Sequence, residues 1–257
     1  MIVTTSYEPS GEQLAKAQAA AKELGAAFAP RGRSSLERLL AEYGEQELLL
    51  VAKDGLQLVR PGEPPLFFHP SMAAIRLKRL RAGEDDAMLS AARIEPGDAV
   101  LDCTAGLASD SIVFSYGVGE KGSVTALESE PIVAWLVADG LATYDTGDER
   151  MNEALRRIRL KRKEHLDYLS GLPDRSVDVV YFDPMFRRPI GASTSISPLR
   201  EQANHRELAR EAVLEARRVA RKAVVMKEQR LSGEFARLGF DHVIPTARKL
   251  GYGVMIL

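Results

Sequence analysis

The sequence predicts an α/β protein with a seven-stranded, mostly parallel sheet, an antiparallel edge strand and helices on both faces, preceded by a small α/β unit. Two observations lead to this fold class. Short apolar runs rich in β-branched residues alternate with amphipathic stretches, which is typical of strand–helix–strand units. Three of these runs end at an acid, namely Asp102, Glu128 and Asp183. Because ligands of open α/β sheets bind at the carboxyl ends of strands, these acids predict where a site would lie.

The composition limits the class of protein. The 257 residues, of which 45% are hydrophobic, can bury a substantial core. A net charge of −1 excludes a uniformly basic protein, so a nucleic-acid-binding surface would have to be local. The single cysteine, Cys103, excludes an intramolecular disulfide framework and a four-cysteine metal site. No charged-then-apolar leader opens the chain, and no apolar run approaches the ~20 residues of a membrane span. We therefore expect a cytoplasmic protein that has no membrane partner. We also expect that it needs no metal.

Residues 1–66 are predicted to form the small α/β unit, and residues 67–257 the larger domain. Capping-box patterns at Ser10 and Ser34 predict the beginnings of two helices in the small unit. A strand at residues 2–5 precedes them, and a hairpin around Asp54-Gly55 follows them. Proline and glycine in residues 61–65 indicate the linker to the larger domain.

Two basic stretches of the larger domain leave alternatives open. Ser71 is predicted to cap a helix whose basic face includes Arg76, Lys78, Arg79 and Arg81, and this face could be solvated or face phosphates. Residues 156–163 hold six arginines and lysines, which could bind phosphates or could protect the edge strand that they enter. His69, in the turn before the first of these stretches, could be structural or catalytic.

The first strand of the larger domain is predicted at residues 99–102 and is followed by a loop of small residues. This strand, loop and helix would leave backbone N–H groups free at the helix start to meet an anionic group. The loop contains Gly106 without the other glycines of a dinucleotide-binding fingerprint, so a smaller ligand with one carboxylate and one ribose is favoured over a dinucleotide. Its candidate ligand-binding residues are Asp102, Thr104, Ala105 and Gly106.

The second and third strands also end at polar residues. Glu128 closes the second strand, about twenty residues past the glycine loop, where an acid accepts hydrogen bonds from ribose hydroxyls. Glu164 and His165 follow the third strand, a position that approaches an adenine in this type of fold. Two successive strands that end in acids strengthen the prediction of a nucleoside-binding edge.

The fourth strand, Val177–Phe182, is the most informative stretch of the chain. Its apolar run is typical of a strand buried on both faces, and Pro184 ends it at Asp183 because proline has no N–H to donate. An acid, a rigid proline and an aromatic ring at Phe186 suit an exocyclic amine held flat during attack. A strand end with an Asx-type turn is the alternative. A loop, a helix at 204–221, a strand at 223–226 and two terminal strands at 241–244 and 252–257 follow.

These motifs together resemble the class I S-adenosylmethionine-dependent methyltransferases. More narrowly, the segments D-C-T-A-G-L-A-S-D, L-E-S-E-P-I-V-A-W-L-V-A-D-G-L and F-D-P-M-F are similar to the RsmJ family of small-subunit ribosomal RNA guanine-N2 methyltransferases. The resemblance covers residues 68–257. It implies a Rossmann-like class I methyltransferase fold with S-adenosylmethionine as cofactor. It also implies that the cofactor is held by Ser109 and Asp110, Glu128 and Ser129, Glu164 and His165, and Asp183.

The resemblance further implies RNA of the small ribosomal subunit as partner. From the chemistry of an aryl amine, we expect Asp183 and Pro184 to accept hydrogen bonds from the substrate amine and Phe186 to stack on the base. The chain departs from the family pattern at Ser109, where arginine is common, and at the Glu164-His165 pair, where two serines are common. Other RNA, protein or small-molecule amines stay open as acceptors. A non-catalytic RNA-binding module and a nucleotide-dependent oxidoreductase are the rival classes, and the oligomeric state is left open.

Overall fold

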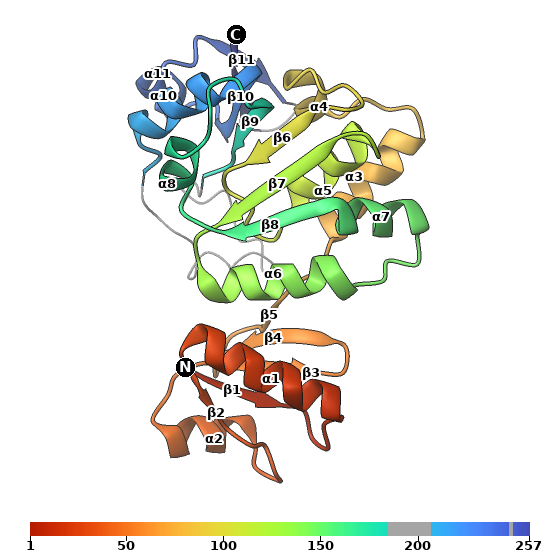
Figure 1. Ribbon diagram of the computed structural model, residues 1–257, viewed down its shortest axis with the longest axis vertical. Coiled ribbons are helices and arrows are strands. Elements are labelled where there is room, and N and C mark those ends of the chain that lie inside the picture. The colour runs from red at the N-terminus through yellow and green to blue at the C-terminus, as the bar shows by residue number, and fades with distance from the viewer. Residues whose placement is uncertain (185–206, 247–248) are drawn as a thin grey trace. The chain divides into compact units, whose positions relative to one another are not determined.

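The computed structural model describes residues 1–184, 207–246 and 249–257, and these form two compact units (Figure 1). One unit contains Met1–His69 together with Pro131–Tyr144. The other contains Pro70–Glu130 and the described residues from position 145 onward. The predicted aromatic residue Phe186 and the loop around it lie outside the described residues. The predicted domain boundary after residue 66 stays a prediction.

The larger unit is built on a seven-stranded sheet, which confirms the predicted fold class. Its strand order is β11-β12-β10-β9-β6-β7-β8. The antiparallel strand near the sheet edge is β12, which runs antiparallel to both of its neighbours, whereas β10, β9, β6, β7 and β8 are parallel. The strands are β6 (Ala99–Asp102), β7 (Ser123–Glu128), β8 (Ile158–Arg162), β9 (Val177–Phe182), β10 (Ala220–Gln229), β11 (His242–Pro245) and β12 (Leu250–Ile256).

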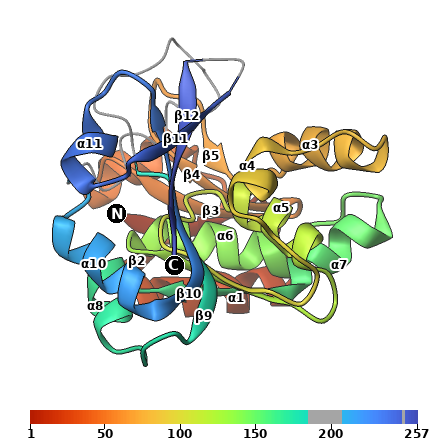
Figure 2. The ribbon, with the colours of Figure 1, turned by 90° about the horizontal axis from the view of Figure 1, so that it is seen from above.

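Helices cover both faces of this sheet, as Figure 2 shows. One face carries α3 (Ser71–Arg81), α4 (Ala87–Ala91), α5 (Ser109–Val118) and α7 (Glu149–Arg157). The other face carries α8 (His165–Ser170), α10 (Arg210–Val219) and α11 (Glu234–Leu238). Strand β9 lies between the two layers. Its Val180 and Phe182 pack with α10, while the ring of Tyr181 meets Phe114 of α5 edge-to-face with 5.0 Å between centroids. This burial on both faces explains the continuous apolar run of β9.

Local sequence signals place most element ends of the larger unit, with corrections for α3 and β10. Asp86, Asp148 and Glu164 accept backbone hydrogen bonds at the beginnings of α4, α7 and α8. The prediction that Ser71 caps α3 was wrong, because Pro70 occupies the N-cap and Ser71 is the first helical residue. The fifth parallel strand, β10, is longer than predicted and continues through residue 227 to 229. Within the part of the chain that the structure describes, no helix is long and apolar enough to cross a membrane.

The smaller unit contains a five-stranded sheet of order β2-β1-β3-β4-β5, in which β1 is parallel to β2 and β3, and the other pairs are antiparallel. Residues 61–65 connect β4 to β5 within this sheet. The strands are β1 (Ile2–Thr5), β2 (Ala27–Phe28), β3 (Leu48–Ala52), β4 (Gly55–Val59) and β5 (Leu66–Phe67). The hairpin turn consists of Lys53 and Asp54, since Gly55 pairs with Ala52 as the first residue of β4.

Among the described residues, the helices of the smaller unit are α1 (Gly11–Leu24), α2 (Leu36–Tyr43) and α6 (Pro131–Thr143). The capping box at Ser10 is confirmed. The N-cap of α2 is Ser35 and not Ser34, since the Ser35 side chain accepts the N–H of Arg38. Helix α6 packs with α1 and β4. A Cβ at its Gly140 would lie 2.1 Å from the ring of Phe68, so a glycine is needed for this close approach.

Candidate functional site

Four neighbouring parallel strands bring their polar ends to one edge of the larger sheet. Asp102 closes β6, Glu128 closes β7, and Asp183 follows β9 directly. Lys227 lies near the end of β10, the strand beside β9. Because these strands are parallel and adjacent, their carboxyl ends meet at one edge, which is where a doubly wound sheet binds its ligands.

Asp102 organises the loop that follows β6. One carboxylate oxygen accepts the Thr104 N–H at 3.0 Å, and the other accepts the hydroxyl of Ser111 on α5. The side chain is buried, and this burial raises the pKa of the Asp102 carboxyl to about 7. Asp102 therefore ties the strand end, the loop and the start of α5 together.

Glu128 lies against the glycine loop. Its two oxygens accept the N–H groups of Gly106 at 3.0 Å and Glu130 at 2.8 Å. The Ala105 N–H also donates to the carbonyl of Leu127 at 2.9 Å, so the loop is fastened to the end of β7 twice. Burial raises the pKa of the Glu128 carboxyl. Ser129 follows this acid directly in the chain.

The glycine loop leads directly into the first turn of α5. Ala108, the residue before the helix, has a φ of 59°, a left-handed conformation that is uncommon for a residue with a side chain. The helix then begins at Ser109, with Asp110 in its first turn. The predicted residues Thr104, Ala105, Gly106, Ser109 and Asp110 thus follow one another from the end of β6 into the helix.

Glu164 and His165 follow β8 and begin α8. Glu164 caps this helix by accepting the N–H of Leu166 at 2.7 Å, and it lies 3.0 Å from Nδ1 of His165. The His165 ring meets Phe182 of β9 edge-to-face, with 5.9 Å between centroids. Burial lowers the pKa of His165 despite the neighbouring acid. The pair is therefore held beside the end of β9, and its expected contact with adenine stays a prediction.

Asp183 is fixed from both its backbone and its side chain. Its N–H donates to the hydroxyl of Thr104, and Lys227 Nζ donates to its Oδ2 at 2.7 Å. Burial raises the pKa of the Asp183 carboxyl to about 6, although the charge of Lys227 acts in the opposite direction. Pro184 comes next and ends the strand. Asp183 is thus joined to the loop after β6 and to β10.

Asp110 is the centre of an ion-pair network. Lys227 Nζ donates to its Oδ2 at 3.0 Å, the Tyr181 hydroxyl donates to the same oxygen at 2.7 Å, and Arg76 pairs with its Oδ1. The two cations hold the pKa of this carboxyl well below its usual range, against the effect of burial. Arg76 also makes two hydrogen bonds of 2.7 Å to Asp86. The network joins α3, α5, β9 and β10.

Sequence reasoning missed four members of this network, namely Arg76, Asp86, Tyr181 and Lys227. Arg76 was assigned to a basic helix face, yet its side chain is only 18% exposed and is paired with two acids. Lys227 stood at the predicted end of a strand, but its partners depend on the pairing of β10 with β9. A lysine in an apolar strand is the signal that could have pointed to a buried acid.

The basic stretch at residues 156–163 enters β8, which is an edge strand of the larger sheet. Arg159, Lys161, Arg162 and Lys163 are exposed, whereas Arg157 is partly buried and donates to the carbonyl of Ser115. The prediction of an edge strand is confirmed. The same exposed cations also form a local basic strip, which we call the β8 strip, on a chain whose net charge is −1.

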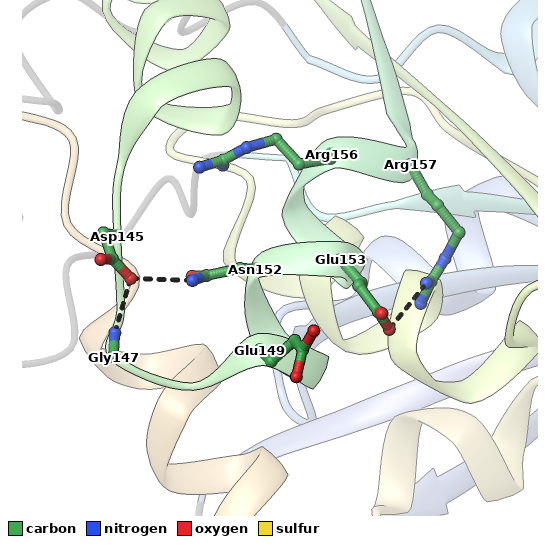
Figure 3. A pocket seen from close by; sticks show the side chains of 7 residues that line it. All are labelled: Asp145, Gly147, Glu149, Asn152, Glu153, Arg156 and Arg157. Atoms are coloured by element: carbon green, nitrogen blue, oxygen red, sulfur yellow. Dashed lines mark hydrogen bonds and ion pairs between the residues drawn. The ribbon is translucent and has the colours of Figure 1, made fainter.

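An open pocket of about 630 Å³ lies at α7 and the turn before it (Figure 3). Asp145 accepts hydrogen bonds from the Gly147 N–H and the Asn152 side chain, and Glu153 pairs with Arg157. The pocket is lined by Asp145, Gly147, Glu149, Asn152, Glu153, Arg156 and Arg157. None of the predicted catalytic or cofactor-binding residues lines this pocket, so it is not the candidate site.

The hydrogen-bond acceptors at the strand ends suit S-adenosylmethionine, which carries a ribose diol and two cationic groups. An ionised carboxylate has about four acceptor positions, and the two N–H groups that fix Glu128 leave room for hydroxyl donors. The loop beside it contains the small residues Thr104, Ala105 and Gly106. The described residues contain no cluster of three or more His, Cys, Asp and Glu that could hold a metal ion.

Comparison with known proteins shows the family to which the chain is similar. The family model described as "Putative SAM-dependent methyltransferase" matches residues 37–236. "Uncharacterized protein YpiP" of Bacillus subtilis is 41% identical over 99% of this chain and 98% of its own length. "Ribosomal RNA small subunit methyltransferase J" of Dechloromonas aromatica is 32% identical, with 63% of this chain and 68% of that protein covered. The same-named protein of Pseudomonas syringae pv. tomato is 34% identical, and the chain spans 52% of its length.

The fold has a close counterpart among solved structures. The crystal structure of a SAM-dependent methyltransferase from Neisseria gonorrhoeae superposes with a TM-score of 0.66 at 20% identity, covering 100% of this chain and 96% of that one. At this identity the likeness supports the fold, while the family match covers the strand ends described above. The chain therefore belongs to the S-adenosylmethionine-dependent methyltransferase family and has its class I, Rossmann-like fold.

Proposed function

We propose that this methyltransferase modifies an exocyclic amine, with guanine N2 in small-subunit ribosomal RNA as its acceptor. The observation that carries the proposal is the Asp183-Pro184 corner at the end of β9. There the carboxylate is held by Lys227 through Oδ2, and the backbone is held by Thr104. Oδ1 of Asp183 and the carbonyl of Pro184 are the two acceptors that we assign to the NH2 group of the substrate.

An aryl amine needs this kind of support because its lone pair is delocalised into the ring. Two acceptors on its N–H groups would orient the nitrogen toward the methyl donor, and orientation is a large source of rate in such transfers. S-adenosylmethionine supplies an activated methyl group on a sulfonium. As the N–C bond forms and the S–C bond breaks, the amine becomes cationic, and the negative charge of Asp183 would stabilise it before it loses a proton.

Ten further residues are proposed to hold the cofactor at the strand ends. Glu128 would accept the ribose hydroxyls, and the Glu164-His165 pair would lie near the adenine. The remaining loop residues would surround the methionine portion. The full set is Asp102, Thr104, Ala105, Gly106, Ser109, Asp110, Glu128, Ser129, Glu164 and His165, with Asp183 at the methyl group.

RNA is the proposed acceptor for two reasons. Two of the relatives described above are named as methyltransferases of ribosomal RNA. In addition, the β8 strip offers exposed cations on an otherwise nearly neutral chain, and RNA phosphates bind such strips. Phe186 would stack on the target base once it leaves its helix, as single-stranded bases commonly stack on aromatic side chains.

Transfer of labelled methyl groups tests the proposal. The acceptors are small ribosomal subunits from cells that lack this protein, with total cell protein as a parallel acceptor. Label in a single guanine is expected, and conversion of that base to N2-methylguanine would be identified by mass spectrometry of the nucleosides. Asp183→Asn should lose this labelling, while Asp174→Asn, a change at an exposed acid, should keep it. Label confined to protein would overturn the ribosomal assignment.

A further inference from the structure

Lys227 contacts two acids that lie 73 positions apart in the chain and belong to different parts of the proposed site. Its Nζ is 2.7 Å from Oδ2 of Asp183 and 3.0 Å from Oδ2 of Asp110. The lysine projects from β10, whose pairing with β9 sets Met226 opposite Phe182. It therefore stands beside Asp183, the residue that follows β9, and it bridges the Asp183-Pro184 corner and the first turn of α5.

We propose that Lys227 is a positioning residue for methyl transfer, which orients the Asp183 carboxylate and couples it to the helix that begins at the cofactor loop. The proposal rests on the role assigned above to Asp183. By holding Oδ2, the ammonium group directs Oδ1 toward the acceptor amine. Without this partner the carboxylate would rotate about its terminal torsion angle, χ2, whose distribution is broad and roughly two-fold.

The charges around Lys227 show why its second contact matters. Arg76 binds both oxygens of Asp86 and also reaches Asp110, so Asp110 is neutralised from the α3 side. Among the described residues, Lys227 is the cation within hydrogen-bond distance of Asp183. A buried ion pair for Asp110 alone would not need it, because Arg76 already serves that acid.

The contact with Lys227 also favours the ionised form of Asp183, which the proposed reaction needs. A neutral carboxyl would donate a proton where the amine needs an acceptor, and burial favours the neutral form. Lys227 opposes this effect, whereas the charge of Asp110 reinforces it. The titratable and charged groups that face this cluster from the packed elements are Arg76 on α3, Asp110 on α5, Asp102 at the end of β6, Tyr181 on β9 and Tyr252 on β12.

Three variants test the proposal, with steady-state methyl transfer measured across pH. Lys227→Met is expected to lower kcat about 10²-fold with little change in KM, because a misplaced carboxylate loses orientation. The acidic limb of its pH–rate profile should move to higher pH, because the Asp183 carboxyl would ionise less readily without Lys227. Lys227→Arg should keep the wild-type limb and give an intermediate kcat. Lys222→Met is the matched control, because Lys222 pairs with Glu95 and Asp98 near the other end of the same strand.

A Lys227→Met protein with wild-type kcat and an unmoved limb would overturn the proposal. If Lys227→Met does not fold, Lys227→Gln replaces it, and a wild-type kcat with an unmoved pH profile in that variant overturns the proposal. Carbon-13 NMR titration of the Asp183 carboxyl, in the cofactor-free protein, needs no acceptor. A higher pKa in Lys227→Met supports the pairing even if ribosomal RNA proves to be the wrong substrate, so the two proposals fail separately.

Discussion

The backbone N–H of Gly106 donates to the carboxylate of Glu128 at 3.0 Å, so the glycine loop after β6 and the acid that closes β7 are one unit. We predict that Glu128→Ala weakens binding of S-adenosylhomocysteine about 10- to 100-fold, because hydrogen bonds to a charged group contribute about 1.5–3 kcal/mol. Isothermal titration calorimetry measures this. Glu120→Ala, a change at an exposed acid in the turn before β7, is the control. Equal affinities for the wild type and Glu128→Ala would contradict the prediction.

The proposed role of Asp183 predicts a pH dependence. Its folded-state pKa is raised to about 6, so the ionised acceptor is lost as pH falls below that value. The rate constant of methyl transfer at saturating cofactor should therefore rise with pH and level off above about pH 7. Asp183→Asn should lower the plateau about 10²-fold while S-adenosylhomocysteine still binds. A flat profile between pH 5 and 8, roughly the range around this pKa, would rule out the role.

Asp102 predicts a change in stability with pH. Its pKa is raised from 3.8 to about 7 in the folded protein, so the folded state holds a proton that the unfolded chain releases. This acid stabilises the fold at low pH, and the contribution is lost as pH rises from about 4 to about 7. Asp102→Asn can accept from Thr104 and donate to Ser111. Its urea midpoint should therefore exceed that of the wild type more at about pH 8 than at about pH 5. A constant difference at both pH values would contradict this.

The β8 strip predicts a salt-dependent contribution to RNA binding. Arg159 and Lys161 lie on the same side of β8, because strand residues two apart share a face. Replacing both with glutamine should weaken RNA binding and reduce the slope of log affinity against log salt by about 2. Affinity for S-adenosylhomocysteine should not change. Lys121→Gln with Arg217→Gln removes two exposed cations elsewhere and should leave the slope unaltered. An equal change of slope in the two double variants would contradict the assignment of the β8 strip to the RNA interface.

The parts of the fold that follow from local chemistry could be predicted from the sequence. Strand β9 ends at Phe182 because Pro184 stops it, and the acids at the strand ends reach one edge because parallel strands align there. The N-cap of α2 could not be resolved, because Ser34 and Ser35 are adjacent and chemically equivalent. The Lys227–Asp183 pair could not be predicted either. It depends on strand order and register, which local sequence does not encode.

Arg76 shows a second limit. A helical pattern assigns an arginine to an exposed face by default, since arginine is rarely buried without a partner. Its partners, Asp86 and Asp110, lie 10 and 34 positions away, and neither spacing is a helical repeat. Only the packing of α3 with α5 shows that this cation pairs with Asp110, an acid of the candidate site.

Helix α6 has a consequence for dissecting the protein. It begins three residues after Glu128, yet it packs with α1 and β4, and its Gly140 accommodates the ring of Phe68. The polypeptide therefore leaves β7, contributes a helix to the smaller unit, and returns to the larger one. Cutting the gene after codon 66 would not yield a clean catalytic fragment. It would leave an apolar helix without α1 and β4, three residues after Glu128 at the end of β7.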